Sequence, residues 1–105
     1  MKPEISKFFD TVITFSQISE SLAIQHIYSK IEDWREDVDL IKSVLIHAPV
    51  DRLPSSVLLG LLTAARWMHG QVDDERRSLA LRVRAALESR DLEPDCVNNC
   101  MKGLE

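Results

Sequence analysis

The segment from Pro54 to Met68 constrains the fold more than any other part of the chain, because almost all of it is apolar. Its polar side chains are limited to Ser55, Ser56, Thr63 and Arg66. At about 3.6 residues per turn, its apolar residues cover two neighbouring faces of a helix rather than one stripe. Such a helix needs other helices on several sides. The sequence therefore predicts that this segment is the central helix of the domain or is shared with a second molecule.

Length and composition limit the fold class. The 105 residues suit one domain, and 45% hydrophobic with 29% charged residues is typical of globular proteins. Three glycines and four prolines supply little turn chemistry for β-hairpins, and no segment alternates apolar and polar residues as a strand does. We predict a single all-α domain over residues 1–105, with four to five helices.

The first predicted helix covers Glu4–Phe15. Its apolar residues recur at helical spacing: Ile5, Phe8, Phe9, Val12 and Phe15. Ser16, Ser19 and Ser21 follow, and serine oxygens can cap the start of a helix. These serines predict a break, although neither glycine nor proline enforces it, and a continuous helix is the alternative.

Apolar residues keep the helical period from Ile24 to Leu45. This pattern favours one long helix that ends at Ala48, because the residue before a proline is driven out of the helical conformation. The alternative is two helices with a restart in the acidic stretch Glu32–Asp39, where Asp37 or Asp39 would cap the second.

The second half of the chain predicts a helix from about Pro54 to near Gly70, a residue suited to a C-cap. Asp73 and Asp74 then favour the start of a last long helix, because carboxylates stabilise the positive end of the helix dipole. Its core stripe comprises Val72, Leu79, Ala80, Val83, Ala86 and Leu87. We expect this helix to close at Arg90 and Asp91, and a short helix over 95–104.

Metal and catalytic chemistry find little support in the sequence. Cys96 and Cys100 lie four residues apart in the predicted last helix, but structural zinc usually takes four Cys or His ligands. The histidines His26, His47 and His69 are isolated from one another, and no serine lies in a nucleophile-elbow motif. We therefore predict no metal site, no cofactor and no enzymatic activity. One acidic cluster lacks the calcium-loop pattern and is expected to be a solvated surface: Glu32, Asp33, Glu36, Asp37 and Asp39.

Charge is distributed unevenly along the chain. The formal net charge is −4, all of it within residues 1–51, whereas the segment 76–90 carries five arginines and one glutamate. A helix over 54–68 followed by one over 75–90 has the outline of a helix-turn-helix, in which Arg77 and Arg84 would contact nucleic acid. Acidic residues at positions 73–75 argue against this alternative, because they would face phosphates.

Protein binding is the function class that the sequence favours. Gly60 and Ala64 would let a second helix approach closely, and Trp and Met are enriched at interfaces. The predicted partner or dimer interface comprises Phe8, Phe9, Val57, Gly60, Leu61, Ala64, Trp67 and Met68.

We therefore expect a non-enzymatic, homodimeric protein of the bacterial cytoplasm. In this prediction it is a regulator or inhibitor of the anti-activator type, which binds another protein such as a transcription regulator. The alternatives are a nucleic-acid-binding protein that uses helix 76–90, and a structural subunit of a larger assembly. The start of the chain does not have the pattern of a signal peptide, and no segment is apolar enough to predict a membrane span.

Overall fold

The computed structural model describes residues 3–68 and 70–90. Within these ranges the chain forms helices and no strand, so the all-α class is confirmed. The helices are α1 (Pro3–Ile18), α2 (Glu20–Asp33), α3 (Val38–Ile46), α4 (Ser55–Ala65) and α5 (Asp73–Glu88), with 3-10 turns η1 (Val50–Arg52) and η2 (Arg66–Met68). The helix predicted over 95–104, with Cys96 and Cys100, lies outside the described residues, as does His69.

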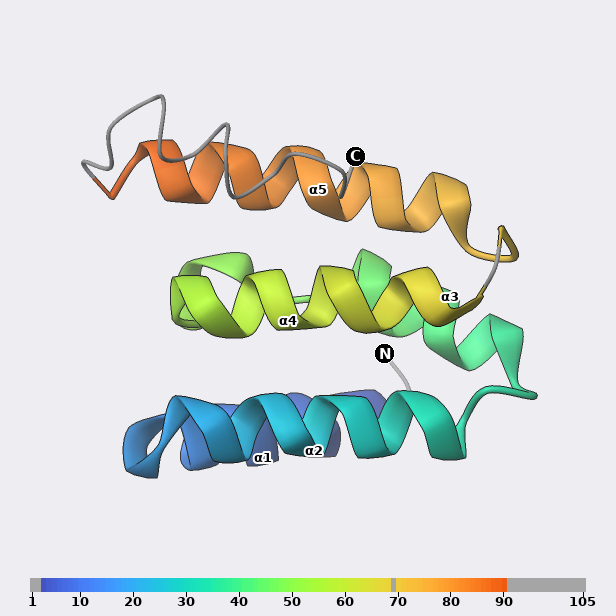
Figure 1. The fold of residues 1–105 in the computed structure, drawn as a ribbon, viewed down its shortest axis with the longest axis horizontal. Helices are drawn as coiled ribbons and strands as arrows, with labels where there is room; N and C mark the ends of the chain where they lie inside the picture. Colours follow the sequence, from blue (N-terminus) through green and yellow to red (C-terminus); the bar gives the residue numbers. More distant parts are fainter. Residues whose placement is uncertain (1–2, 69, 91–105) are drawn as a thin grey trace.

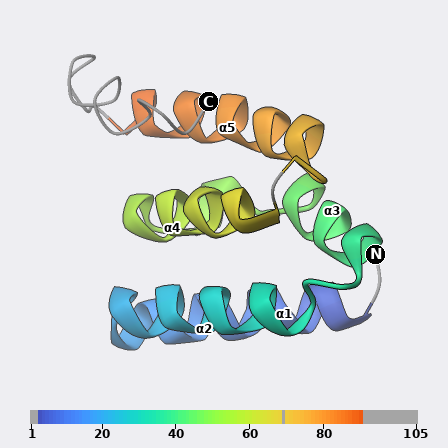
Figure 2. The ribbon, with the colours of Figure 1, turned by 45° about the vertical axis from the view of Figure 1, so that its right-hand side comes forward.

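The helices are stacked in three levels. Figure 1 shows α1 and α2 side by side at one level, α3 and α4 at the next, and α5 on top. Figure 2 keeps this order after rotation, and shows α3 leaning across the end of the stack. In agreement with this arrangement, α2 and α5 both contact α4, and α3 contacts α1 and α5.

A single residue separates α1 from α2. Ser19 has an extended backbone (φ −161°, ψ 127°), and its N–H donates to the Phe15 carbonyl at 2.8 Å. The two helices then run in opposite directions (Figure 1). The break predicted at the serines is confirmed, and it lies at Ser19.

The long helix favoured for 24–48 is wrong, because α2 ends at Asp33 and α3 begins at Val38. In the turn between them, the Asp37 N–H donates to the Trp34 carbonyl at 2.8 Å. The Asp37 carboxylate accepts from the Leu40 N–H at 3.2 Å, which caps α3. The alternative with a restart at Asp37 is therefore the one observed.

The start of α5 agrees with the prediction, since Asp73 and Asp74 lie in its first turn. Gly70 precedes it with φ +88°, a left-handed conformation that favours glycine. The end of the preceding helix differs, because α4 stops at Ala65 and continues as the 3-10 turn η2.

The core draws on all five helices. Seven of the eleven residues of α4 are buried, and the predicted core stripe of α5 is buried along its whole length. Aromatic rings fill the α1–α2 side, where Phe8 packs against Phe9 and Trp34 with ring centres 4.9 and 5.3 Å apart. No charged or polar residue among the described ones is classed as buried. No helix within these ranges is long and apolar enough to cross a membrane.

Candidate functional site

Most of the residues predicted for the interface lie inside the fold. Of its eight residues, seven are buried within the chain itself: Phe8, Phe9, Val57, Gly60, Leu61, Ala64 and Met68. A partner could contact them extensively only if the helices separated. Trp67 alone remains well exposed, with 43% of its surface accessible.

Gly60 has a closely packed neighbour within the chain. A Cβ atom built on Gly60 would lie only 3.2 and 3.3 Å from the two γ-carbons of Ile24 on α2. The helix that approaches Gly60 closely is therefore α2 of the same chain, and no second molecule is needed to account for the glycine.

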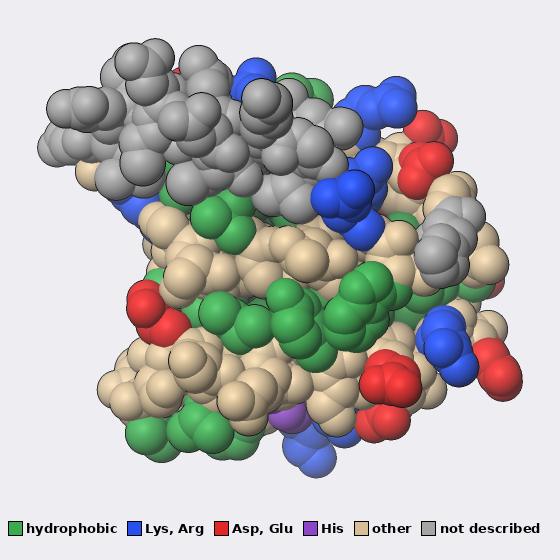
Figure 3. Space-filling view, in the orientation of Figure 1, with side chains coloured by type: hydrophobic (Ala, Val, Ile, Leu, Met, Phe, Trp, Pro, Cys, Tyr) green, Lys and Arg blue, Asp and Glu red, His purple; other side chains and the backbone are tan. Residues whose placement is uncertain are grey.

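Trp67 extends from η2 toward α2 over the surface. Its ring centre lies 4.9 Å from that of Tyr28, with the ring planes inclined by 46°. Figure 3 shows a row of apolar side chains across this face of the molecule, between the levels of α4 and α2. The indole thus packs on the Tyr28 ring of α2 at the surface of the molecule.

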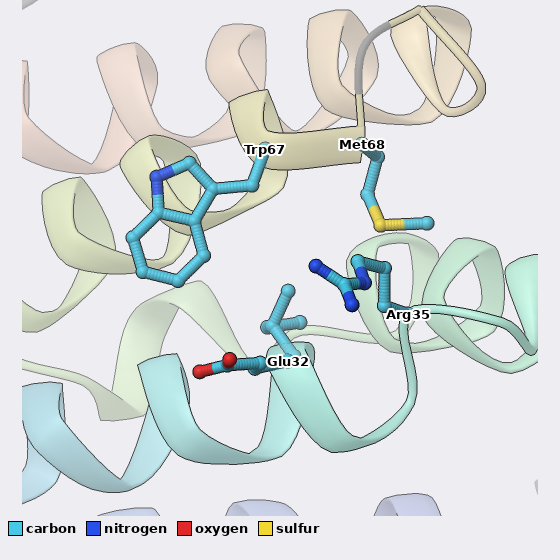
Figure 4. Close-up of a pocket in the computed structure, with 5 residues that line it drawn as sticks. Glu32, Arg35, Trp67 and Met68 are labelled. Atoms are coloured by element: carbon cyan, nitrogen blue, oxygen red, sulfur yellow. The ribbon is translucent and has the colours of Figure 1, made fainter.

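A hollow of about 340 Å³ opens beside the indole. It is lined by Ile31, Glu32, Arg35, Trp67 and Met68. We call these five residues the Trp67 surface. Figure 4 shows the indole and Met68 extending from η2, the Glu32 side chain lying along α2 below the indole, and the Arg35 side chain rising from the turn that follows α2. Ile31 and Met68 are buried, so they provide an apolar base.

The charged groups of the Trp67 surface have no partner among the described residues. Within residues 3–68 and 70–90, neither the Glu32 carboxylate nor the Arg35 guanidinium forms a hydrogen bond or an ion pair. Both residues are exposed. The hollow therefore offers an apolar base together with one group of each charge, a combination that suits an apolar side chain flanked by charged residues.

One arginine in α5 and one just after it donate hydrogen bonds to other parts of the fold. Arg82 donates to the carbonyls of Leu45 and Ala48, at the end of α3. Arg90 donates to two carbonyls of the connection before α4, Val50 O at 3.0 Å and Leu53 O at 2.7 Å, and to Ser55 Oγ at the start of α4 at 2.9 Å. We call Arg82 and Arg90 the arginine pair.

The two arginines predicted for nucleic-acid contact differ in accessibility. Arg77 is exposed and Arg84 is half-buried. The acidic start of α5 also contacts α3, because the Glu75 carboxylate forms an ion pair with the Lys42 ammonium at 3.9 Å. The concentration of arginine in this helix is thus explained in part by contacts within the domain.

The candidate metal ligands are dispersed. No group of three or more His, Cys, Asp or Glu side chains in the described ranges could hold a metal ion. His26 packs on Phe8, whereas the His47 Nδ1 lies 2.9 Å from the Ser43 carbonyl at the end of α3. The acidic cluster at 32–39 is exposed around the α2–α3 turn, where Asp37 acts as the helix cap.

Comparison with known proteins provides no relative. No family model, no curated protein and no solved structure matches the chain.

Proposed function

We propose that the protein is a non-enzymatic regulator that acts in the cytoplasm by binding another protein through the Trp67 surface. The observation that carries the proposal is the exposed indole beside a hollow with a buried apolar base and two uncommitted charges. Tryptophan and arginine are the residues most enriched at interface hot spots. A segment of a second protein, for example a transcription regulator held inactive, would insert an apolar side chain here.

The same surface supports the proposal of a homodimer around α2 and η2. A two-fold axis repeats every contact. If Glu32 of one copy lies opposite Arg35 of the other, Arg35 of the first copy also lies opposite Glu32 of the second. The Trp67 surface carries both charges and is therefore self-complementary. If dimer and partner use one surface, partner binding competes with self-association and depends on protein concentration.

The first test is the solution mass by size-exclusion chromatography with light scattering, over a wide range of concentration. We expect a dimer that Trp67→Ser converts to monomer while circular dichroism shows an unchanged helix content. Leu81→Ser is the matched control, because Leu81 is 61% exposed on α5 and outside the Trp67 surface. A dimer that survives Trp67→Ser would overturn the dimer proposal.

A charge exchange makes the test specific. Glu32→Arg and Arg35→Glu should each weaken the dimer by placing like charges together, and the double variant should restore it. Failure of the double variant to recover would exclude the two-fold arrangement.

If the wild type is monomeric, capture from the native host decides the regulatory proposal. A partner retained by Leu81→Ser and lost with Trp67→Ser supports it. Identical captures by the two variants would contradict it.

A further inference from the structure

A second hollow, of about 360 Å³, lies between α1 and α2. It is lined by Glu4, Lys7, Phe8, Thr11, His26, Lys30 and Trp34, and it shares no residue with the Trp67 surface. Its volume falls at the lower end of the range for small-molecule sites, about 300–1,000 Å³.

Three rings form one wall of this hollow. Phe8 is nearly inaccessible and lies against the other two rings. The His26 ring stacks on it at 5.7 Å with the planes inclined by 23°, and the Trp34 ring meets it edge-on at 5.3 Å. A flat apolar group would find favourable stacking and edge contacts on such a wall.

Positive groups surround the rings. Lys7 comes from α1 and Lys30 from α2, with the Lys30 ammonium 5.8 Å from the centre of the Trp34 ring. Glu4 is the one carboxylate in the lining. Residues 1–51 contain five Lys or Arg against nine Asp or Glu, so two lysines with one carboxylate around a hollow differ from the acidic balance of this half of the chain.

The His26 ring is available to a ligand. Its nitrogens form no hydrogen bond with any of the described residues. Burial, and secondly the charge of Lys30, lower the pKa of His26 below its ordinary value. An anion placed among these groups would raise the pKa of His26 again, because it stabilises the protonated ring.

We propose that this hollow binds a small aromatic anion, with a carboxylate or phosphate among Lys7, His26 and Lys30 and its ring against Trp34. The hydrogen of the Thr11 hydroxyl is already committed to the Lys7 carbonyl at 2.9 Å, so the two lysines and the histidine are the donors. The site stands independently of the proposed regulatory function, since it uses none of the residues of the Trp67 surface.

Titration of the full chain with phenyl phosphate, followed by NMR, tests the site. We expect the His26 ring and Trp34 indole signals to shift, the Trp67 indole signal to stay, and the pKa of His26 to rise, with a Kd of about 1 mM or below. Phenylacetate in a parallel titration distinguishes the two sources of negative charge, because the tighter of the two probes identifies the preferred group.

Charge-neutral variants assign the binding to this hollow. Lys7→Gln and Lys30→Gln should each weaken phenyl phosphate binding by about threefold to fivefold. Lys42→Gln, on α3 and outside the lining, is the matched control and should leave the Kd unchanged. Thermal unfolding of each variant verifies that the fold is retained.

Three results would overturn the proposal. The first is the absence of any shift at about 10 mM phenyl phosphate. The second is a loss of affinity in Lys42→Gln equal to that in the two lining variants. The third is equal binding of inorganic phosphate, which would show that the aromatic wall contributes nothing.

Discussion

The contact between α2 and α4 and the contact of α5 with the α3–α4 connection are formed by different chemistry. The first is apolar, and its close approach depends on Gly60 and Ile24. The second adds five hydrogen bonds from the arginine pair to four backbone carbonyls and one hydroxyl. Where two helices pack along their lengths, their backbone N–H and C=O groups are already hydrogen-bonded within each helix, so the fit of the side chains determines the contact. Where a helix covers a helix end and an irregular turn, the exposed carbonyls need donors.

The apolar contact should be the more sensitive to loss of volume. Leu61 on α4 is fully buried, so Leu61→Ala is expected to lower the free energy of unfolding by about 3 kcal/mol through lost burial and a residual cavity. Denaturant unfolding measures this loss. Leu81→Ala, at an exposed position, should change stability by less than about 0.5 kcal/mol. Similar losses in both variants would refute the assigned packing of α4.

The arginine contact should be sensitive to loss of donors while the side-chain volume is kept. Arg90→Met retains an apolar stem and removes all three hydrogen bonds, and we expect a loss of about 2 kcal/mol in the free energy of unfolding. Arg90→Lys should recover less than half of it, because one ammonium does not reproduce the planar donor geometry. Arg77→Met, at an exposed position, is the control. Equal stability of the Arg77 and Arg90 variants would remove the structural role of the arginine pair.

The fit between Gly60 and Ile24 can be measured as a coupling. Gly60→Ala forces the Ile24 side chain to shift, and Ile24→Ala removes the two γ-carbons that stand in the way. We expect a favourable coupling of about 0.5–1 kcal/mol in a double-mutant cycle followed by denaturant unfolding. Strict additivity would mean that α2 and α4 are less closely apposed than described.

Lowering the pH should have the smallest effect on stability. It should leave the arginine contact unchanged, since arginine stays protonated over the physiological range. The pKa of His26 is lowered in the folded protein. Below about pH 6.5 the unfolded state therefore binds more protons than the folded state, and the free energy of unfolding decreases as the pH is lowered. Thermal unfolding of His26→Gln between about pH 7.5 and about pH 5.5 should show a smaller decrease in Tm than the wild type. Parallel decreases in the two proteins would argue against a half-buried, neutral ring.

The elements that sequence predicts best are those with a local physical cause. Asp73 and Asp74 mark the start of α5, because a carboxylate and the helix dipole interact within one turn. The break after α1 lies at Ser19, which precedes α2 although its hydroxyl forms no capping hydrogen bond. The helix boundary at Asp37 was harder, since apolar residues keep the helical period across the turn and no glycine or proline marks it. The cap alone indicated it, as one of two alternatives.

The candidate site was predicted less well, because burial is a property of the whole fold. The apolar circumference of α4 is covered within the chain, so most of the residues expected at an interface are in the core. The partners of Arg82 and Arg90 lie 34 to 40 positions away in sequence, beyond the reach of any periodic pattern. Exposure of Trp67 follows from its place in η2, a 3-10 turn that the helical pattern did not predict.

The single-residue link at Ser19 also orders the assembly of the protein during synthesis. The contacts between α1 and α2 are close in sequence, so this hairpin can form rapidly once both helices have emerged. The side of α2 that carries Ile24 then faces water until α4 is synthesised. In that interval the nascent chain presents an unprotected apolar surface, and this is the stage at which it is most vulnerable to aggregation.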